Sequence, residues 1–224
     1  MQLSDKTLEI LKNFSKINVN LFIEKGSSHL RTVSESKNIF ASVEVEETFP
    51  VDAGIMNLHK LLQTMSMFEQ PDLSFEDTHI LITEAEGRNT FTYYYTEPNC
   101  LTYPKAQVKD FPTPVTFTLN EDTLGQIIKA SSISQLPDVK ITYDNNVVAL
   151  ELQDRQNPTS NVFSFKLDGQ GTESITAFMK VENLKLVAGD YKMMVSNTAS
   201  RLENLSPEMA TLQYCIAMDL THVR

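Results

Sequence analysis

The chain contains one short helical pattern twice. Residues 3–17 read LSDKTLEILKNFSKI, and residues 119–133 read LNEDTLGQIIKASSI in the same register. Ser4 and Asn120 occupy equivalent positions, where a side-chain oxygen can accept an unpaired N–H of the first helical turn. An acidic residue follows each of them, near the positive end of the helix dipole. Because a remainder of similar length follows each copy, the pattern indicates two related halves.

The length and the middle of the chain agree with a division into two domains. At 224 residues and 41% hydrophobic, the chain is close to the size at which one core gives way to two. Residues 97–114 hold four prolines and show no sustained hydrophobic period, which is typical of a linker. We therefore expect an N-terminal domain over residues 1–108 and a similar C-terminal domain over residues 109–224.

Most of the remaining sequence alternates apolar and polar residues between turn-forming residues, which predicts antiparallel strands. The strands are expected at 18–24, 29–33, 39–45, 48–51, 73–75, 79–84, 90–96, 115–119, 139–143, 147–152, 161–167, 174–180, 191–196 and 210–220. Residues 144–146 read DNN, which predicts a two-residue hairpin turn. Further helices are expected at 57–68 and 182–187. The predicted fold class is α+β, with antiparallel sheets and two helices in each domain.

Several protein classes lack support in the sequence. The N-terminus has no basic flank followed by an apolar stretch, and the longest apolar run, residues 147–150, is too short to span a bilayer. We therefore expect a soluble intracellular protein without a membrane partner. Cys100 and Cys215 have no CxxC partner and are expected to be reduced thiols.

Catalytic and metal-binding motifs are also lacking. The sequence has no HExxH, GxxxxGK[ST] or GxSxG pattern, and its four histidines are scattered. Glu44, Glu46 and Glu47 could in principle form a metal-dependent nuclease site, but outward-facing acids on an alternating strand explain them better. We therefore expect no enzyme activity, no cofactor and no bound metal.

The polar faces of the helices carry the functional signal. A net charge of −10 argues against a generally basic surface, although the position of the positive charges matters more than their sum. In residues 5–17, Lys12 and Lys16 stand with Glu9 opposite an apolar stripe of Ile10, Leu11, Phe14 and Ile17. In the second helix the expected buried stripe is Leu58, Leu61, Leu62, Met65 and Phe68, and the opposite face holds His59, Lys60, Gln63, Thr64 and Met67.

The third helix repeats the arrangement. Leu124, Ile127 and Ile128 are expected to be buried, with Gln126 and Lys129 facing away. Each lysine alone is explained as an ordinary solvated residue. Their recurrence on equivalent helices of an acidic protein favours a shared basic surface.

The opening LSDKTLEILKNFSKIN, the LHKLL helix, the proline-rich middle and GDYKMMVS at 189–196 resemble the sliding clamps of T-even-type bacteriophages. These clamps are the processivity factors of the phage replicative DNA polymerase, and the resemblance covers essentially the whole chain. It implies the DNA-clamp fold: a homotrimer that closes into a ring around double-stranded DNA, with helices lining the hole and continuous sheet outside. Binding would need no sequence preference, because lysines neutralise phosphates without reading bases.

The same resemblance implies the partners. They are the phage DNA polymerase, a clamp loader and, in addition, phage late-transcription factors, all acting in the cytoplasm of the infected bacterial host. The alternative that the residues leave open is a non-catalytic β-rich structural or carbohydrate-binding protein.

Three groups of candidate residues follow from the helical geometry and the resemblance together. Those expected to face DNA are Lys12, Lys16, Lys60 and Lys129, with Lys6 and Lys185 as weaker candidates. Those expected at the subunit interface are Phe91, Tyr93 and Tyr95 on one edge and Val162, Phe163 and Phe165 on the other. Those expected to form an exposed pocket for partner peptides are Leu101, Tyr103, Val108 and Phe111. The simpler alternative is that the strand and linker residues pack within their own domains.

Overall fold

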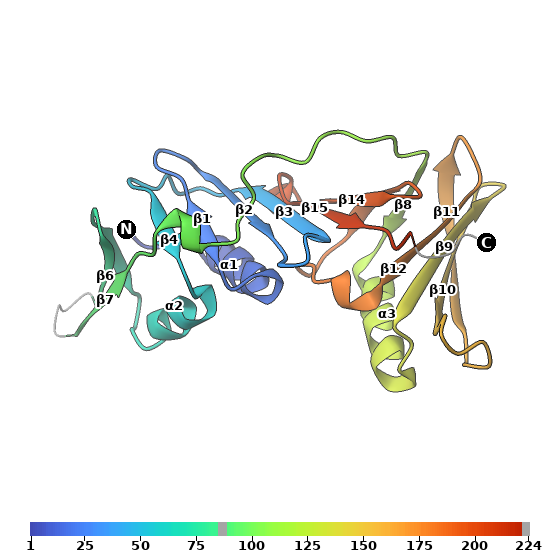
Figure 1. Ribbon diagram of the computed structural model, residues 1–224, viewed down its shortest axis with the longest axis horizontal. Coiled ribbons are helices and arrows are strands. Elements are labelled where there is room, and N and C mark those ends of the chain that lie inside the picture. The colour runs from blue at the N-terminus through green and yellow to red at the C-terminus, as the bar shows by residue number, and fades with distance from the viewer. Residues whose placement is uncertain (85–88, 221–224) are drawn as a thin grey trace. The chain divides into compact units, whose positions relative to one another are not determined.

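The computed structural model describes residues 1–84 and 89–220 (Figure 1). It divides the chain into two compact units, Met1–Gln107 and Val108–Arg224. The division lies one residue before the boundary expected from the linker composition. Each unit has its own buried apolar residues, so each can be understood from its own elements.

The two helices of the first unit begin at side-chain caps. α1 (Asp5–Ile17) starts after Ser4, whose hydroxyl accepts the N–H of Thr7 at 3.2 Å. α2 (Leu58–Met65) starts after Asn57, whose side chain accepts the N–H of Lys60 at 2.8 Å. The predicted apolar stripe of α1 is confirmed, because its members are all less than a tenth exposed: Ile10, Leu11, Phe14 and Ile17.

The strands of the first unit form small antiparallel groups. Two pairs are β1 (Leu21–Ile23) with β4 (Ala53–Ile55), and β2 (His29–Val33) with β3 (Ile39–Glu44). A separate sheet has the order β5-β6-β7, built from β5 (Asp72–Phe75), β6 (His79–Thr83) and β7 (Thr90–Tyr94).

The strand expected at residues 48–51 is wrong: Phe49 exchanges backbone hydrogen bonds with Gly26 and Ser27, but a strand forms only later, at β4. A glycine is needed there, because a Cβ on Gly54 would lie 2.0 Å from the carbonyl oxygen of Thr96. The N–H of Thr96 in turn donates to the Gly54 carbonyl at 2.9 Å. The close approach of the two backbones therefore requires glycine at the centre of β4.

The second unit is built on antiparallel pairs in the order β12-β9-β10-β11-β8-β13-β14-β15. Its strands are β8 (Val115–Leu119), β9 (Asp138–Asp144), β10 (Val147–Gln153), β11 (Phe163–Gly171), β12 (Ile175–Lys180), β13 (Tyr191–Val195), β14 (Ala199–Asn204) and β15 (Gln213–Ala217). Asn145 and Asn146, between β9 and β10, both have positive φ, at 49° and 65°. This confirms the predicted hairpin turn, because primed turns need positive φ at both central residues.

α3 (Glu121–Ser134) repeats the start of α1. Asn120 accepts the N–H of Thr123 at 2.8 Å, as Ser4 does for Thr7. The caps predicted from the repeat are therefore confirmed in both units.

Two predictions for the second unit are wrong. Residues 182–187 do not form a fourth helix, because the chain makes only a 3-10 turn, η2 (Val181–Asn183). Six residues give too few hydrogen bonds to offset the cost of helix nucleation. The strand predicted at 210–220 is shorter, and β14 before it was missed. The described part of the chain thus has three α-helices and not four.

Glu47 has a role that its sequence context did not suggest. Its carboxylate accepts hydrogen bonds from the N–H of Ser4 at 2.5 Å and the hydroxyl of Thr7 at 2.6 Å. Glu47, in a loop far away in the sequence, therefore stabilises the N-terminus of α1. Burial raises the pKa of Glu47, but these hydrogen bonds outweigh burial and hold the pKa below its usual value. The expectation that Glu47 is one of three simple outward acids is therefore wrong.

Replacing Glu47 with alanine is expected to destabilise the first unit by about 1–2 kcal/mol at pH 7, since a partly exposed charged acceptor is lost. The carboxylate has a lowered pKa in the folded state, so its contribution is present at neutral pH. This contribution decreases as the pH falls below the value of an unfolded glutamate. Urea unfolding of parent and variant from pH 3 to pH 7 should show the difference shrinking towards acid. A difference that is constant with pH would contradict the assignment.

Candidate nucleic-acid interface and subunit edges

Exposed lysines project from all three helices. Lys12 and Lys16 on α1, Lys60 on α2 and Lys129 on α3 are exposed, and Lys6 on α1 is half-buried. Within the described residues, none of their ammonium groups has an ion-pair partner, whereas Lys140 and Lys180 on strands each pair with a carboxylate. The helix lysines therefore keep their charge available for an anionic partner.

The faces around these lysines are not uniformly basic. Exposed Glu9 lies on α1, and Glu121 and Asp122 occupy the exposed first turn of α3. The helix faces therefore hold single positive charges among polar residues. Such a surface suits weak and salt-sensitive contact with phosphates better than tight binding.

Four positions differ from the expected pattern, and two of them, Leu62 on α2 and Phe68 beyond its end, are half-buried where burial was expected. Thr64 on α2 is buried and not solvent-facing, because its hydroxyl donates to the carbonyl of Lys60 at 3.0 Å and needs no water. Ile128 on α3 is 45% exposed and not buried. Ile128 borders an open hollow together with Leu136 and Leu184, so the apolar stripe of α3 is narrower than its sequence suggested.

Lys185 does not lie on a helix. It is half-buried and follows η2, where the fourth helix was expected. The helical argument for placing Lys185 with the other lysines therefore fails.

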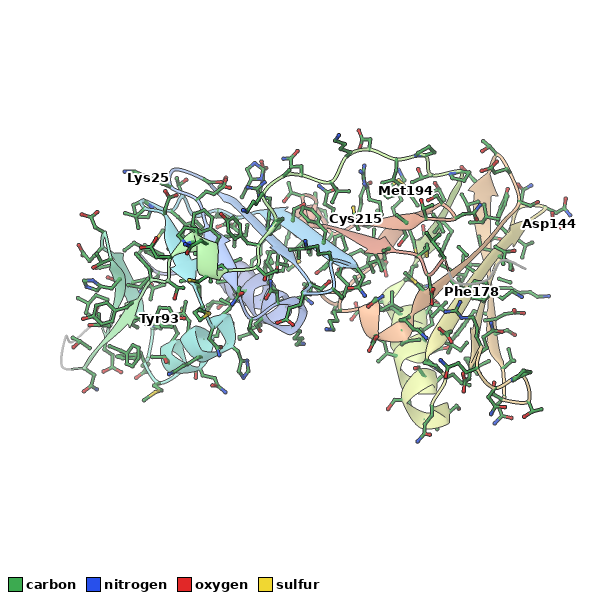
Figure 2. All side chains as sticks on the ribbon, in the orientation of Figure 1. Lys25, Tyr93, Asp144, Phe178, Met194 and Cys215 are labelled. Carbon is green, nitrogen blue, oxygen red and sulfur yellow. The ribbon has the colours of Figure 1, made fainter. Side chains whose placement is uncertain are left out.

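β7 lies at the edge of its sheet, because in the described chain it pairs only with β6. Phe91 is 37% exposed, and Tyr93, labelled in Figure 2, is half-buried. The Tyr93 hydroxyl lies 3.1 Å from the N–H of Asn57 and 3.4 Å from its carbonyl, so this side chain also fixes the start of α2. Burial raises the pKa of Tyr93 despite these contacts.

Tyr95 follows the end of β7. Burial and, less strongly, the nearby charges of Glu76 and Asp77 raise the pKa of Tyr95 to about 12. Its hydroxyl is buried without a hydrogen-bond partner among the described residues. Tyr95 is thus half-buried in its unit and is not a simple exposed edge residue.

β11 supplies a second free edge. Residues 163–168 pair with β10 on one side, and only residues 169–171 pair with β8 on the other. Val162 is 58% exposed and Phe163 is 44% exposed, while Phe165 is half-buried. The rings of Phe163 and Phe165 lie 4.9 Å apart at 77°, an edge-to-face pair on one side of the strand. An unpaired backbone edge beside exposed apolar groups is suited to pairing with another chain.

The linker residues are less exposed than expected. Leu101, Tyr103 and Phe111 are half-buried, and only Val108 is exposed, at 37%. The Tyr103 ring lies 4.7 Å from that of Phe22, so Tyr103 pins the linker to β1. The role of these four residues in docking partner peptides therefore stays a proposal.

Arg201 on β14 holds the second part of the linker and was missed from the sequence. Its Nη2 donates to Asp110 at 2.9 Å, and its guanidinium lies 5.3 Å from the ring centre of Phe111. Burial alone would lower the pKa of Arg201, but the Asp110 carboxylate and the nearby Cys215 thiol raise it. Burial, partly offset by Arg201, also raises the pKa of Cys215, whose place on β15 is labelled in Figure 2.

The described residues include no helix long and apolar enough to cross a membrane. They also include no cluster of three or more histidine, cysteine, aspartate or glutamate side chains suited to a metal ion.

The fold of this chain is similar to that of three solved structures of proliferating cellular nuclear antigen (PCNA). The chain superimposes on the PCNA of Entamoeba histolytica with a TM-score of 0.71 and 15% identity, covering 95% of this chain and 94% of that one. The PCNA2–PCNA3 complex of Sulfolobus tokodaii gives a TM-score of 0.73 at 12% identity, covering 97% of each chain. A. fulgidus PCNA, solved with the C-terminal region of FEN-1 bound, gives 0.70 at 16% identity, covering 96% of this chain and 97% of that one.

Comparison of sequences is more specific. No family model matches the chain. The sliding clamp of Vibrio phage KVP40 is 27% identical over 227 aligned positions, covering 98% of this chain and 99% of the relative. The sliding clamps of Escherichia phage RB69 and Enterobacteria phage T4 are each 23% identical, covering 99% of both chains. In sequence this chain is therefore similar over nearly its whole length to the sliding clamps of the bacteriophages KVP40, RB69 and T4, and in fold it is similar to PCNA.

Proposed function

We propose that this protein is a sliding clamp that encircles duplex DNA and tethers the phage replicative DNA polymerase for processive synthesis. The observation that carries the proposal is the set of exposed, unpaired lysines on α1, α2 and α3 in a chain similar to phage clamps from end to end. The lysines with this role are Lys12, Lys16, Lys60 and Lys129, with Lys6 in support. They would attract phosphates of any sequence, so the clamp could move along the duplex.

The two free strand edges support a ring. An edge on the first unit (β7) and a different edge on the second (β11) allow each subunit to join the next head to tail. Heterologous contacts of this kind close only when the rotation between subunits permits, and three subunits are proposed here. Phe91 and Tyr93 on one edge would meet Val162, Phe163 and Phe165 on the other.

The function proposed requires no catalysis and no cofactor. The acidic character of the chain, with a net charge of −10, would disfavour DNA on surfaces away from the helices. Retention would then come from topology and not from affinity. A clamp loader would open the ring on the template in the host cytoplasm, and late-transcription factors are proposed as further partners beside the polymerase.

The test is whether the protein stays on DNA because of topology. Loaded with a clamp loader and ATP onto a nicked circular plasmid, the protein should co-elute with the DNA through gel filtration. Cutting the plasmid once with a restriction enzyme should release it, since a ring slides off a free end. Equal retention on circular and linear DNA would contradict encirclement. The absence of binding to both would instead favour the structural or carbohydrate-binding alternative.

A further inference from the structure

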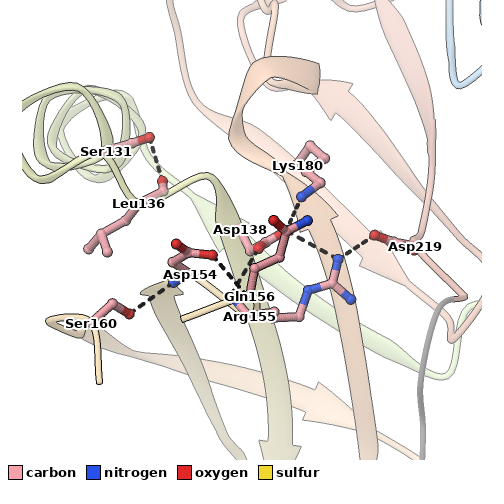
Figure 3. A network of polar contacts seen from close by, with 9 residues as sticks. All are labelled: Ser131, Leu136, Asp138, Asp154, Arg155, Gln156, Ser160, Lys180 and Asp219. Carbon is pink, nitrogen blue, oxygen red and sulfur yellow. Dashed lines mark hydrogen bonds and ion pairs between the residues drawn. The ribbon is translucent and has the colours of Figure 1, made fainter. Parts of the chain in front are cut away.

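A buried carboxylate lies at the centre of a charged cluster in the second unit (Figure 3). Asp138, the first residue of β9, is 1% exposed, and its Oδ1 lies 2.7 Å from Lys180 Nζ and 3.1 Å from Arg155 Nη2. Burial raises the pKa of Asp138, but the two cations and the N–H of Arg155 hold it below its usual value. The charge is therefore compensated, as a buried carboxylate must be.

Arg155 also extends to the end of the described chain. The same Nη2 pairs with Asp219, and the Asp219 N–H donates to the carbonyl of Phe178 on β12 at 2.7 Å. The guanidinium carbon lies 4.7 Å from the ring centre of Phe178. A single side chain thus joins β9, β12 and the segment that follows β15.

Arg155 stands at the start of the loop that leads into β11. The N–H of Arg155 donates to Asp138 at 3.3 Å, which fixes the first turn of the loop. The N–H of Asp154 donates to the hydroxyl of Ser160 at 3.3 Å, so the far end of the loop is tied back to its beginning. Ser160 lies two residues before Val162, where the exposed edge begins.

We propose that Arg155 is a positioning residue for the β11 edge. Held between Asp138 and Asp219, it fixes the loop that determines where Val162 and Phe163 lie. Asp219, far away in sequence, then contributes to subunit contact without touching the neighbouring subunit. The inference about assembly depends on the proposed ring, whereas the inference about the loop does not.

The test uses Asp219→Ala, which removes one carboxylate partner of Arg155 and leaves Asp138 paired. Glu151→Ala is the matched control. Its carboxylate pairs with Lys140 of β9 at 3.0 Å and is 33% exposed, against 25% for Asp219. Glu151 lies on β10 opposite Ser164 of β11, so this control tests whether the loss of any ion pair beside β11 is enough to change the exchange. Hydrogen exchange and a dilution series by mass photometry should be measured on the full chain.

With Asp219→Ala, the amides of residues 160–165 should exchange at least about fivefold faster than in the parent, and the assembly should dissociate at about fivefold higher concentration. Glu151→Ala should change neither quantity. Arg155→Lys should change both quantities at least as much as Asp219→Ala, because it also weakens the contact with Asp138. The double variant should be no worse than Arg155→Lys alone, because Asp219 acts on the loop through Arg155.

Unchanged exchange at residues 160–165 in Asp219→Ala would overturn the proposal, as would an equal effect of Glu151→Ala. If exchange rises but the parent does not assemble, the loop assignment stands and the proposed ring fails. If exchange rises in Asp219→Ala and the parent assembles, but the variant dissociates at the same concentration as the parent, then Arg155 does not position β11 for subunit contact. The proposal then fails.

Discussion

Reversing the charge of Lys12, Lys16 and Lys129 together is expected to abolish retention on circular duplex DNA and the stimulation of polymerase processivity. Each phosphate contact contributes about 0.9 to the slope of log affinity against log salt, and a ring of three subunits would sum nine such positions. We therefore expect the lifetime of the loaded clamp at physiological salt to fall by at least about tenfold. The fold should persist, since all three side chains are exposed and unpaired in the described chain.

A control of equal charge separates local contact from overall repulsion. Lys25, Lys37 and Lys192 are also exposed, but they lie on turns and a strand. Changing either set of three lysines to glutamate takes the net charge from −10 to −16, because each change contributes −2. If only the total charge mattered, both variants would lose DNA alike. If the helix variant loads and stimulates polymerase as well as the parent, the helices do not line the DNA path.

The parts of the fold that the sequence predicted are those determined by neighbouring residues. Ser4 and Asn120 cap helices because a short polar side chain reaches the N–H three residues later, whatever the rest of the chain does. Asn145 and Asn146 adopt positive φ for an equally local reason. The exposure of Lys12 follows from helical periodicity once the buried stripe is known.

The parts that could not be predicted depend on contacts across long separations. Glu47 serves α1 from 43 residues away, and Arg201 holds Asp110 from 91 residues away. Neither contact is marked by a hydrophobic period or a local motif in the sequence. The fourth helix was predicted because it would complete the repeating order of helix and strands. The conformation of so short a segment is instead determined by its tertiary contacts, here the burial of Asn183 and Leu184.

The candidate site shows the same division. Aromatic composition marked β7 and β11 as unusual strands, yet their free edges depend on strand order, which no local signal contains. The linker residues were expected to be exposed because loops usually are. Tyr103 and Phe111 are instead half-buried against Phe22 and Arg201, partners that only the folded chain brings near.

Replacing Val162 with glutamate is expected to convert the assembled protein into monomers at micromolar concentration. Val162 is 58% exposed next to the unpaired edge of β11, so the isolated subunit should tolerate a charge there. In a subunit contact the same charge would be buried against apolar groups without a partner, which costs several kcal/mol. Mass photometry should show loss of the trimer, with an unchanged circular dichroism spectrum.

Val147→Glu provides the matched control. Val147 is 43% exposed on β10, whose two edges are both paired with neighbouring strands, so it is not expected to meet another subunit. This variant should remain trimeric. A parent that shows only monomers or even-numbered oligomers would contradict the trimer itself, whereas an intact trimer in Val162→Glu would contradict only the choice of edge.

Mixing two defective subunits tests the head-to-tail arrangement directly. Phe91→Glu should also give monomers, because it places the charge on the β7 edge, where Phe91 is 37% exposed. The Val162→Glu subunit keeps an intact β7, and the Phe91→Glu subunit keeps an intact β11, so one complete contact can form between them. The mixture should therefore yield a one-to-one dimer that cannot close, since its two outer edges both carry the added charge. If each edge instead paired with its own copy, the single variants would already form dimers through their unaltered edge, and mixing would produce no new species.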